Sequence, residues 1–190
     1  NQTEELAENL HFSGGQIKLY DSNVLVEEGF NYPPEILTVG TLAAGTAGDH
    51  TFARPAASDT DTYYYKAHYV WTDAQGNLHR SGLSNQFSWD YAHTASNAYL
   101  LTAEVFIPSL PLTQKSNVYV ELYRTVKNGT LFYKLNANNN DTKSQTFDPI
   151  LNQPDADFIS FLDKTPDSAL TSNEVLYTTG GVLENISPPS

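Results

Sequence analysis

A run of apolar side chains at every second position from Tyr63 to Trp71 constrains the fold of this chain more than any other feature. These side chains belong to Tyr63, Tyr65, Ala67, Tyr69 and Trp71. Because successive side chains of a strand point to opposite faces, the pattern predicts a strand over residues 63–72 with one buried, aromatic face. Turn-forming residues occupy positions 73–77, and a serine-rich stretch over 78–84 returns beside the strand, which predicts a β-hairpin.

Shorter runs of the same kind recur along the chain. Twelve Tyr and nine Phe are spread among Val, Ile, Leu and Thr, and these residue types favour strands. We therefore predict further strands, in chain order, at residues 87–91, 98–107, 118–126, 130–135, 147–150 and 158–162. Pro108 and Pro111 are expected to close the 98–107 strand, because proline cannot donate a hydrogen bond to a neighbouring strand.

The predicted strand over 118–126 has two distinct faces in the sequence. The inward positions are expected to be Val118, Val120 and Leu122, and the outward positions Tyr119, Glu121 and Tyr123. The tripeptide Lys127-Asn128-Gly129 follows and predicts a type I′ turn that leads into the return strand.

The remaining segments are expected to be irregular, apart from a short helix and a hairpin near the N-terminus. Residues 3–10 begin with Thr and two Glu and predict a short helix. Residues 16–26 predict a hairpin that turns at Asp21-Ser22-Asn23. Loops or turns are expected at residues 41–61, 136–144 and 163–173.

Together these elements predict an all-β fold, an antiparallel β-sandwich of the fibronectin III or immunoglobulin type with strand-bearing arms. The expected organisation is an N-terminal arm over residues 1–40, a sandwich domain over 41–172 and an exit segment over 173–190. The arm is expected to form part of a propeller-like neighbour. At 190 residues the chain is long enough to bury a core without a metal or disulfide.

Composition excludes several classes of function. The chain has no Cys, which removes disulfides, zinc–thiolate sites and thiol nucleophiles. Its net charge is −12 with only 10 Lys and Arg, so we expect no tight nucleic-acid binding and no binding to an anionic membrane. The first residue is Asn1 and no apolar segment follows it, so we expect a soluble piece of a longer protein without a signal peptide.

The order of the central segments resembles fibronectin type III-like domains of phage structural proteins. The segments that carry this resemblance are residues 63–73, the Gln75-Gly76-Asn77 turn with Ser81 and Ser84, residues 120–125, residues 161–163 and residues 166–170. The flanks are similar to tail nozzle-type proteins of short-tailed phages, in which the sandwich is inserted between propeller-like strands. The flanking segments are Gly14-Gly15, residues 19–21, residues 27–30, Pro34-Glu35, residues 176–185 and Pro188-Pro189. The resemblance implies a structural role and supplies no catalytic residue.

Candidate sites in the sequence are few. The five histidines are His11, His50, His68, His79 and His93, and only His68 and His79 are expected to face each other, without a third metal ligand. Asp59 with Asp61, and Asp155 with Asp157, have the alternate spacing of calcium loops but lack the rest of an EF-hand, so solvated loops are the preferred interpretation. No Gly-x-Ser-x-Gly motif is present. We predict no catalytic, cofactor-binding or metal-ligating residues and no enzyme activity.

Two functions from different classes fit this sequence. The first is a structural module of a phage virion, located in the tail, whose partners are copies of itself in a ring and neighbouring tail proteins. The alternative is a secreted or surface module that binds carbohydrate, with the tyrosines from Tyr63 to Tyr65 stacking on sugar rings. An accessory domain beside a catalytic one is a third interpretation. The N-glycosylation tripeptides at Asn1, Asn128, Asn140 and Asn185 matter only on a eukaryotic secretory route.

Overall fold

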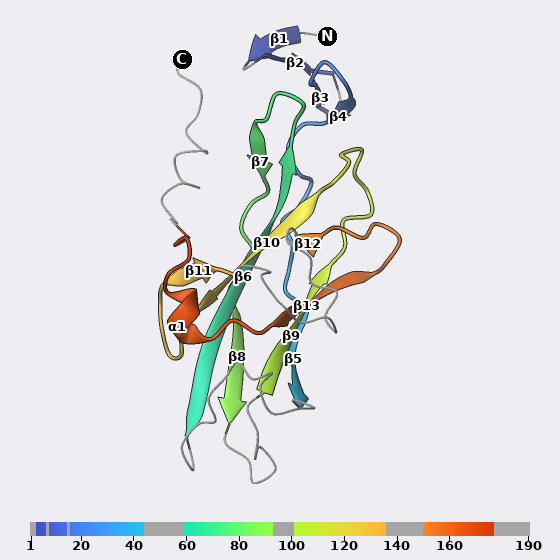
Figure 1. Ribbon diagram of the computed structural model, residues 1–190. Coiled ribbons are helices and arrows are strands. Elements are labelled where there is room, and N and C mark those ends of the chain that lie inside the picture. The colour runs from blue at the N-terminus through green and yellow to red at the C-terminus, as the bar shows by residue number, and fades with distance from the viewer. Residues whose placement is uncertain are drawn as a thin grey trace.

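The fold is seen in a computed structural model that describes residues 3–6, 8–14, 16–43, 59–92, 101–135 and 150–176. These residues form three antiparallel sheets and one short helix (Figure 1). The N-terminal sheet contains, in spatial order, β1 (Thr3–Leu6), β2 (Asn9–Phe12), β3 (Lys18–Tyr20) and β4 (Leu25–Glu27). The prediction of an all-β, antiparallel fold is confirmed, whereas the fibronectin or immunoglobulin type of sandwich stays a prediction.

Two larger sheets make up the rest of the described chain. The large sheet contains β6 (Thr60–Thr72), β7 (Leu78–Arg80), β8 (Phe87–Ala92), β10 (Tyr119–Thr125), β11 (Phe132–Lys134) and β12 (Ile150–Leu151). The small sheet contains β5 (Thr38–Ala43), β9 (Leu101–Pro108) and β13 (Phe158–Asp163). From β5 to β13 the chain passes between these two sheets four times, so their packing depends on contacts between residues far apart in sequence.

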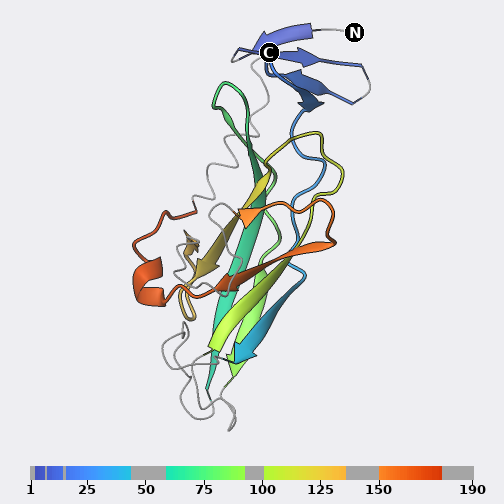
Figure 2. The ribbon, with the colours of Figure 1, turned by 45° about the vertical axis from the view of Figure 1, so that its right-hand side comes forward.

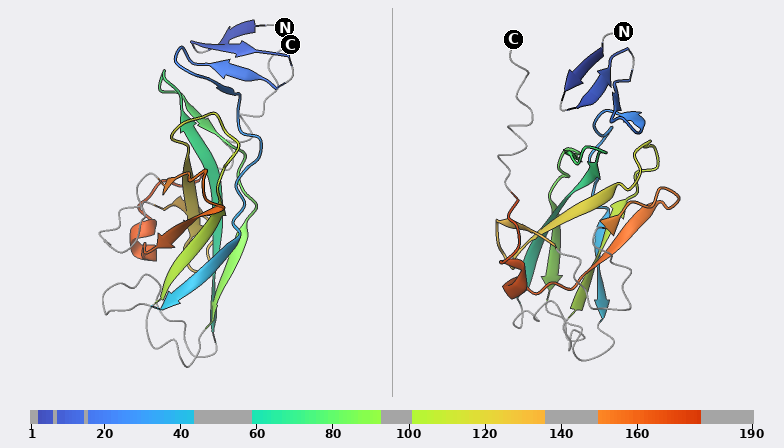
Figure 3. Two further views of the ribbon diagram at one scale, coloured as in Figure 1. Left: turned by 90° about the vertical axis from the view of Figure 1, so that its right-hand side faces the viewer. Right: turned by 45° about the horizontal axis from the view of Figure 1, so that its top comes forward.

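One hydrophobic core joins all three sheets. The alternating face of β6 is buried as predicted, with Tyr63 and Trp71 at its two ends only 2% and 3% exposed. Side chains of β9 and β13 in the small sheet, among them Val105 and Phe161, belong to the same core. Leu19 and Val26 of the N-terminal sheet also belong to it. Figures 2 and 3 show the N-terminal sheet at one end of the elongated body formed by the larger sheets.

Two serines continue the edge of the large sheet between β7 and β8. The amide of Ser81 donates to the carbonyl of Tyr69 (2.9 Å), and the amide of Tyr69 donates to the hydroxyl of Ser81 (2.9 Å). Ser84 repeats the arrangement with Ala67, at 2.8 and 2.9 Å. The hydroxyl oxygens thus take the place of carbonyls where the regular strand pairing is interrupted, which gives the serine-rich return segment a physical role.

Replacing Ser84 with alanine is expected to lower the free energy of unfolding by about 1–3 kcal/mol, because the buried amide of Ala67 would lose its acceptor. Ser88→Ala on the exposed side of β8 is the control, with an expected change within about 0.5 kcal/mol. Urea unfolding followed by tryptophan fluorescence measures both variants. Equal effects of the two substitutions would contradict this role of Ser84.

The predicted helix over residues 3–10 is wrong. β1 and β2 form a hairpin there, in which Glu5 lies opposite Leu10, and Leu10 in turn lies opposite Tyr20 of β3. Glu8 in the connecting turn has a φ of 65°, a backbone conformation that ends any helix. A segment of this length gains more from pairing with β3 than from an isolated helical turn or two.

Three further predictions need correction. The loop expected over 41–61 is wrong at both ends, because β5 continues to Ala43 and β6 begins at Thr60, so a strand crosses the expected domain limit at residue 41. The turn after β10 is not type I′, since only Asn128 of its residues has a positive φ (52°), and type I′ requires two. The turn expected over 163–173 contains α1 (Asp167–Leu170).

The other strand predictions agree with the structure where it describes them. The 87–91 and 158–162 strands are β8 and β13, and the hairpin expected over 16–26 is β3 and β4. The polar loop at 136–144 lies outside the described residues, as do most of the 147–150 strand and the exit segment. No helix in the described part of the chain is long and apolar enough to span a membrane.

Candidate functional site

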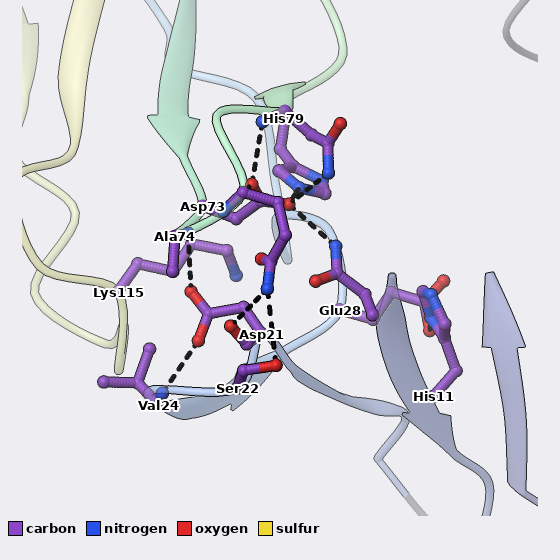
Figure 4. Close-up of polar contacts among 12 residues, drawn as sticks. His11, Asp21, Ser22, Val24, Glu28, Asp73, Ala74, His79 and Lys115 are labelled. Atoms are coloured by element: carbon purple, nitrogen blue, oxygen red, sulfur yellow. Dashed lines mark hydrogen bonds and ion pairs between the residues drawn. The ribbon is translucent and has the colours of Figure 1, made fainter. Parts of the chain in front are cut away.

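The densest set of buried polar contacts in the described residues lies where the N-terminal sheet meets the tip of the β6–β7 hairpin. We call this set the polar junction; it is centred on Asp21, Glu27, Asp73 and Lys115. Figure 4 shows Asp21 and Asp73 close together, with Ala74 and His79 beside them. The two aspartates begin two different turns, one after β3 and one after β6.

Asp73 organises the turn of the β6–β7 hairpin and also reaches the N-terminal sheet. Its Oδ1 accepts hydrogen bonds from the amides of Gln75 (3.0 Å) and Asn77 (2.7 Å). Its Oδ2 accepts from Asn9 Nδ2 of β2 (2.7 Å) and lies 3.0 Å from His79 Nε2. Burial opposes ionisation, but the hydrogen bonds from His79, Asn9 and Asn77 outweigh it and hold the pKa of Asp73 well below its usual range.

Asp21 makes the matching contacts from the N-terminal sheet. Its Oδ1 accepts from the amides of Asn23 (3.0 Å) and Val24 (2.8 Å), which closes its own turn. Its Oδ2 accepts from the amide of Ala74 (2.9 Å), and its carbonyl accepts from Gln75 Nε2 (2.7 Å). The pKa of Asp21 is lowered by the three amide hydrogen bonds, against the opposing effects of burial and of the Asp73 charge. Each turn is thereby hydrogen-bonded to the other.

Glu27 and Lys115 form the second half of the polar junction. Lys115 Nζ lies 3.0 Å from Glu27 Oε1 and donates to the carbonyls of Glu27 and Gly29. The hydroxyl of Thr113 and the amide of Gln114 donate to the Glu27 carboxylate. Burial lowers the pKa of Lys115, and its bonds to Glu27 oppose that change. The loop after β9 is therefore attached to β4 by a buried ion pair and several hydrogen bonds.

Two aromatic rings enclose the ammonium group of Lys115. Its Nζ lies 5.2 Å from the ring centre of Phe30 and 5.4 Å from that of Trp71. Both distances are within the range of cation–π attraction. These contacts connect the ion pair to the hydrophobic core, because Trp71 is a core residue and Phe30 packs against the core.

The chemistry of the polar junction is structural. The carboxylates of Asp21, Glu27 and Asp73 each have three or more N–H or O–H donors around them, and these hydrogen bonds stabilise the ionised groups. The described residues contain no group of three or more His, Cys, Asp or Glu that could hold a metal ion. The arrangement instead fixes the N-terminal sheet in one orientation against the larger body.

Acid is expected to weaken the polar junction. The pKa values of Asp21, Glu27 and Asp73 are all lowered in the fold, so their contribution to stability is complete above the pKa of the unfolded chain and is lost as pH falls below about 4. Urea unfolding between pH 3 and pH 6 should show a steep loss of stability below that value. A free energy of unfolding that is unchanged down to pH 3 would contradict the contribution of these carboxylates.

The structure separates the histidines that the sequence pairs. Pairing across the hairpin places His79 opposite Trp71, on the core side of β6, whereas His68 lies opposite Glu121 on the other side. The prediction that His68 and His79 face each other is therefore wrong. His11 contacts Glu28 at 3.1 Å. His50 and His93 lie outside the described residues.

The predicted outward face of β10 is also wrong. Glu121 and Tyr123 are only 4% and 3% exposed. Glu121 is buried because four donors surround its carboxylate, and these are His68, Arg80, Tyr123 and Lys134. Strand alternation correctly separates the two faces of β10, but it does not reveal that polar neighbours cover the second face.

The remaining candidate residues do not come together. Asp61 is buried and lies 2.9 Å from Lys127 Nζ, whereas Asp59 is exposed, so these two aspartates share no cation-binding geometry. Asp155 and Asp157 are both exposed. Asn128 is exposed, and its side-chain oxygen accepts from the amide of Thr62 (2.9 Å). The asparagines of the other three glycosylation tripeptides, Asn1, Asn140 and Asn185, lie outside the described residues.

Sequence reasoning missed the polar junction because its residues had ordinary local explanations. Asp21 and Asp73 were identified only as turn formers, and both do form turns. Glu27 lies only in a segment that carries the family resemblance, and no pattern in the sequence singles out Lys115. Comparison of the chain with protein-family models, with curated proteins and with solved structures finds no significant match.

Proposed function

We propose that this chain is a structural module of a phage virion, part of a tail component of the nozzle type, which acts by binding other proteins. The observation that carries the proposal is the polar junction. It attaches the N-terminal sheet to the larger body through buried carboxylates and Lys115. A module that transmits position between subunits needs such a fixed angle, whereas a flexible tether needs none.

The four short strands of the N-terminal sheet support the same proposal. They form a simple antiparallel meander, the arrangement of one blade of a β-propeller. On the side away from the core, Tyr20 and Leu25 are 40% and 52% exposed. The resemblance to nozzle-type proteins implies propeller-like strands in this part of the chain, and a four-stranded meander fits that role.

The acidic balance fits a component that surrounds DNA without binding it. With a net charge of −12, a wall of such modules repels a phosphate backbone. Neutralising carboxylates that face the channel should then change DNA retention or ejection. No change in either would count against this placement of charge.

The alternative, a carbohydrate-binding module, has no specific observation in its favour. Tyr63 and Tyr65, the strand tyrosines that motivated it, are 2% and 0% exposed and belong to the core. Tyr64 on the opposite face is half-buried. Sugar binding by stacking requires an accessible ring.

The native mass and shape of the protein test the proposed function. Mass photometry with negative-stain imaging should reveal closed rings or another defined oligomer. A monomer at every concentration, which binds a sugar on a glycan array, would contradict the proposal and favour the carbohydrate-binding alternative.

A further inference from the structure

A buried carboxylate holds two cations in place on the outer side of the large sheet. Glu121 Oε2 lies 2.7 Å from His68 Nε2 and accepts from the hydroxyl of Tyr123 (3.1 Å). The same oxygen accepts from Arg80 Nε (3.2 Å), and Oε1 accepts from Lys134 Nζ (2.6 Å). Burial opposes the ionisation of Glu121, but its bonds to His68 and Lys134 and the charges of Lys134 and Arg80 lower its pKa well below the usual range.

The two cations keep donors that no described residue uses. Only Nε of the Arg80 guanidinium is hydrogen-bonded, which leaves the terminal nitrogens, and the side chain is 31% exposed. Lys134 Nζ makes one hydrogen bond, and its side chain is 28% exposed. Lys66 of β6 lies on the same side of the large sheet, and its Nζ is 4.8 Å from the ring centre of Phe132. We call Lys66, Arg80 and Lys134 the cationic patch.

The cationic patch is unusual in so acidic a chain. It gathers three of the chain's 10 Lys and Arg residues on one side of the large sheet. The carboxylates near it are the buried Glu121 and the exposed Glu174, whose charge also acts on Arg80. Because Glu121 fixes Arg80 and Lys134 through one oxygen each, their free N–H groups are positioned in advance for an incoming oxyanion.

We propose that the cationic patch binds carboxylates of a second copy of this chain, in the loop between β12 and β13. This inference rests on the proposed function, because it names one contact by which the module assembles. In that loop Asp155 and Asp157 are both exposed, and the ion pairs among the described residues include neither of them. An acidic chain repels its own copies except where such opposite charges meet.

The positions of the two surfaces favour a head-to-tail contact. Figures 1 and 2 show β11, which carries Lys134, on one side of the molecule and the loop between β12 and β13 on the other. A contact between two different surfaces of identical chains leaves one surface free on the first subunit and the other surface free on the last. It therefore propagates, and it closes into a ring when the rotation between subunits divides a full turn.

Sedimentation velocity of the whole chain at low and high salt tests this contact. The double substitution Arg80→Gln and Lys134→Gln, or Asp155→Asn and Asp157→Asn, should weaken self-association about tenfold or more, and so should 0.5 M salt. The control variants Lys18→Gln and Asp59→Asn each remove one charge outside both surfaces and should leave association unchanged. Circular dichroism confirms that each variant is folded.

A charge exchange separates this contact from a general effect of charge. Lys134→Glu alone should abolish association, and combining it with Asp155→Lys and Asp157→Lys should restore it. If the wild-type chain associates but the patch variants associate equally well, the contact is wrong and the proposed function stands. If the wild-type chain is monomeric throughout, both fail. Saturable binding of inorganic phosphate at the patch without self-association would assign the patch to a free oxyanion and overturn the proposal.

Discussion

Replacing Asp163 with alanine should lower the free energy of unfolding by about 3–5 kcal/mol, because it leaves a buried arginine without its main counter-charge. Asp163 and Arg124 are both 0% exposed, and Arg124 Nε lies 3.1 Å from Asp163 Oδ2. The same oxygen accepts from the hydroxyl of Tyr65 (3.0 Å), and the amide of Thr165 donates to Oδ1 (3.0 Å). Guanidinium chloride unfolding measures the change.

Two comparisons test whether the loss comes from an unpaired buried charge. Asp167→Asn removes the second carboxylate near Arg124. Because the side chain of Asp167 is 34% exposed, this substitution should lower the free energy of unfolding by about 1 kcal/mol or less. The joint replacement of Arg124 with Met and Asp163 with Leu removes both buried charges and should be much less harmful than Asp163→Ala. A loss below 1 kcal/mol for Asp163→Ala would show that the pair is not essential.

Replacing Asp73 with alanine should cost roughly 3 kcal/mol, since it removes a charged acceptor from several buried donors at once. The substitution breaks the bond from Asn9 to the hairpin and releases the turn amides of Gln75 and Asn77. We expect the loss to be uneven along the chain. Hydrogen exchange should accelerate most in β1–β4, because that sheet is attached through the polar junction.

Asp73→Asn provides the matched control. The amide keeps one oxygen acceptor for the turn but loses the charge, so β1–β4 should show an intermediate loss of protection. Protection factors in β1–β4 that are unchanged by Asp73→Ala, with the whole loss spread over the large sheet, would contradict the role assigned to the polar junction.

The core of the fold can be predicted from the sequence where the alternation of side chains along a strand is enough to decide which residues are buried. The buried face of β6 is predictable because strand geometry exposes alternate residues to opposite sides, and Tyr63 to Trp71 obey that alternation. On β10 the rule separates the two faces but does not predict that Glu121 is buried, because the burial comes from cations of β7 and β11 that surround it. The residue types that predict a helix over residues 3–10 likewise do not reveal the hairpin turn at Glu8, where φ is 65°.

The polar junction could not be predicted from the sequence, for a different reason. Its bonds join residues far apart in the chain, such as Asp21 with Ala74, which are 53 positions apart, and Glu27 with Gln114, which are 87 apart. Each residue satisfies a local turn or strand pattern that needs no distant partner. The contacts exist only after β3, β6 and the loop after β9 have packed around one core.

The distance between the N-terminal sheet and the small sheet tests most directly whether this chain is a rigid module. The chain has no Cys, so the exposed residues Leu25 of β4 and Ser160 of β13 can be replaced with cysteine and spin-labelled without other changes. Double electron–electron resonance should give one narrow distance distribution, which Asp73→Ala broadens. A broad distribution in the otherwise unchanged chain would mean that the polar junction does not fix the two parts, and the structural role proposed for it would fall.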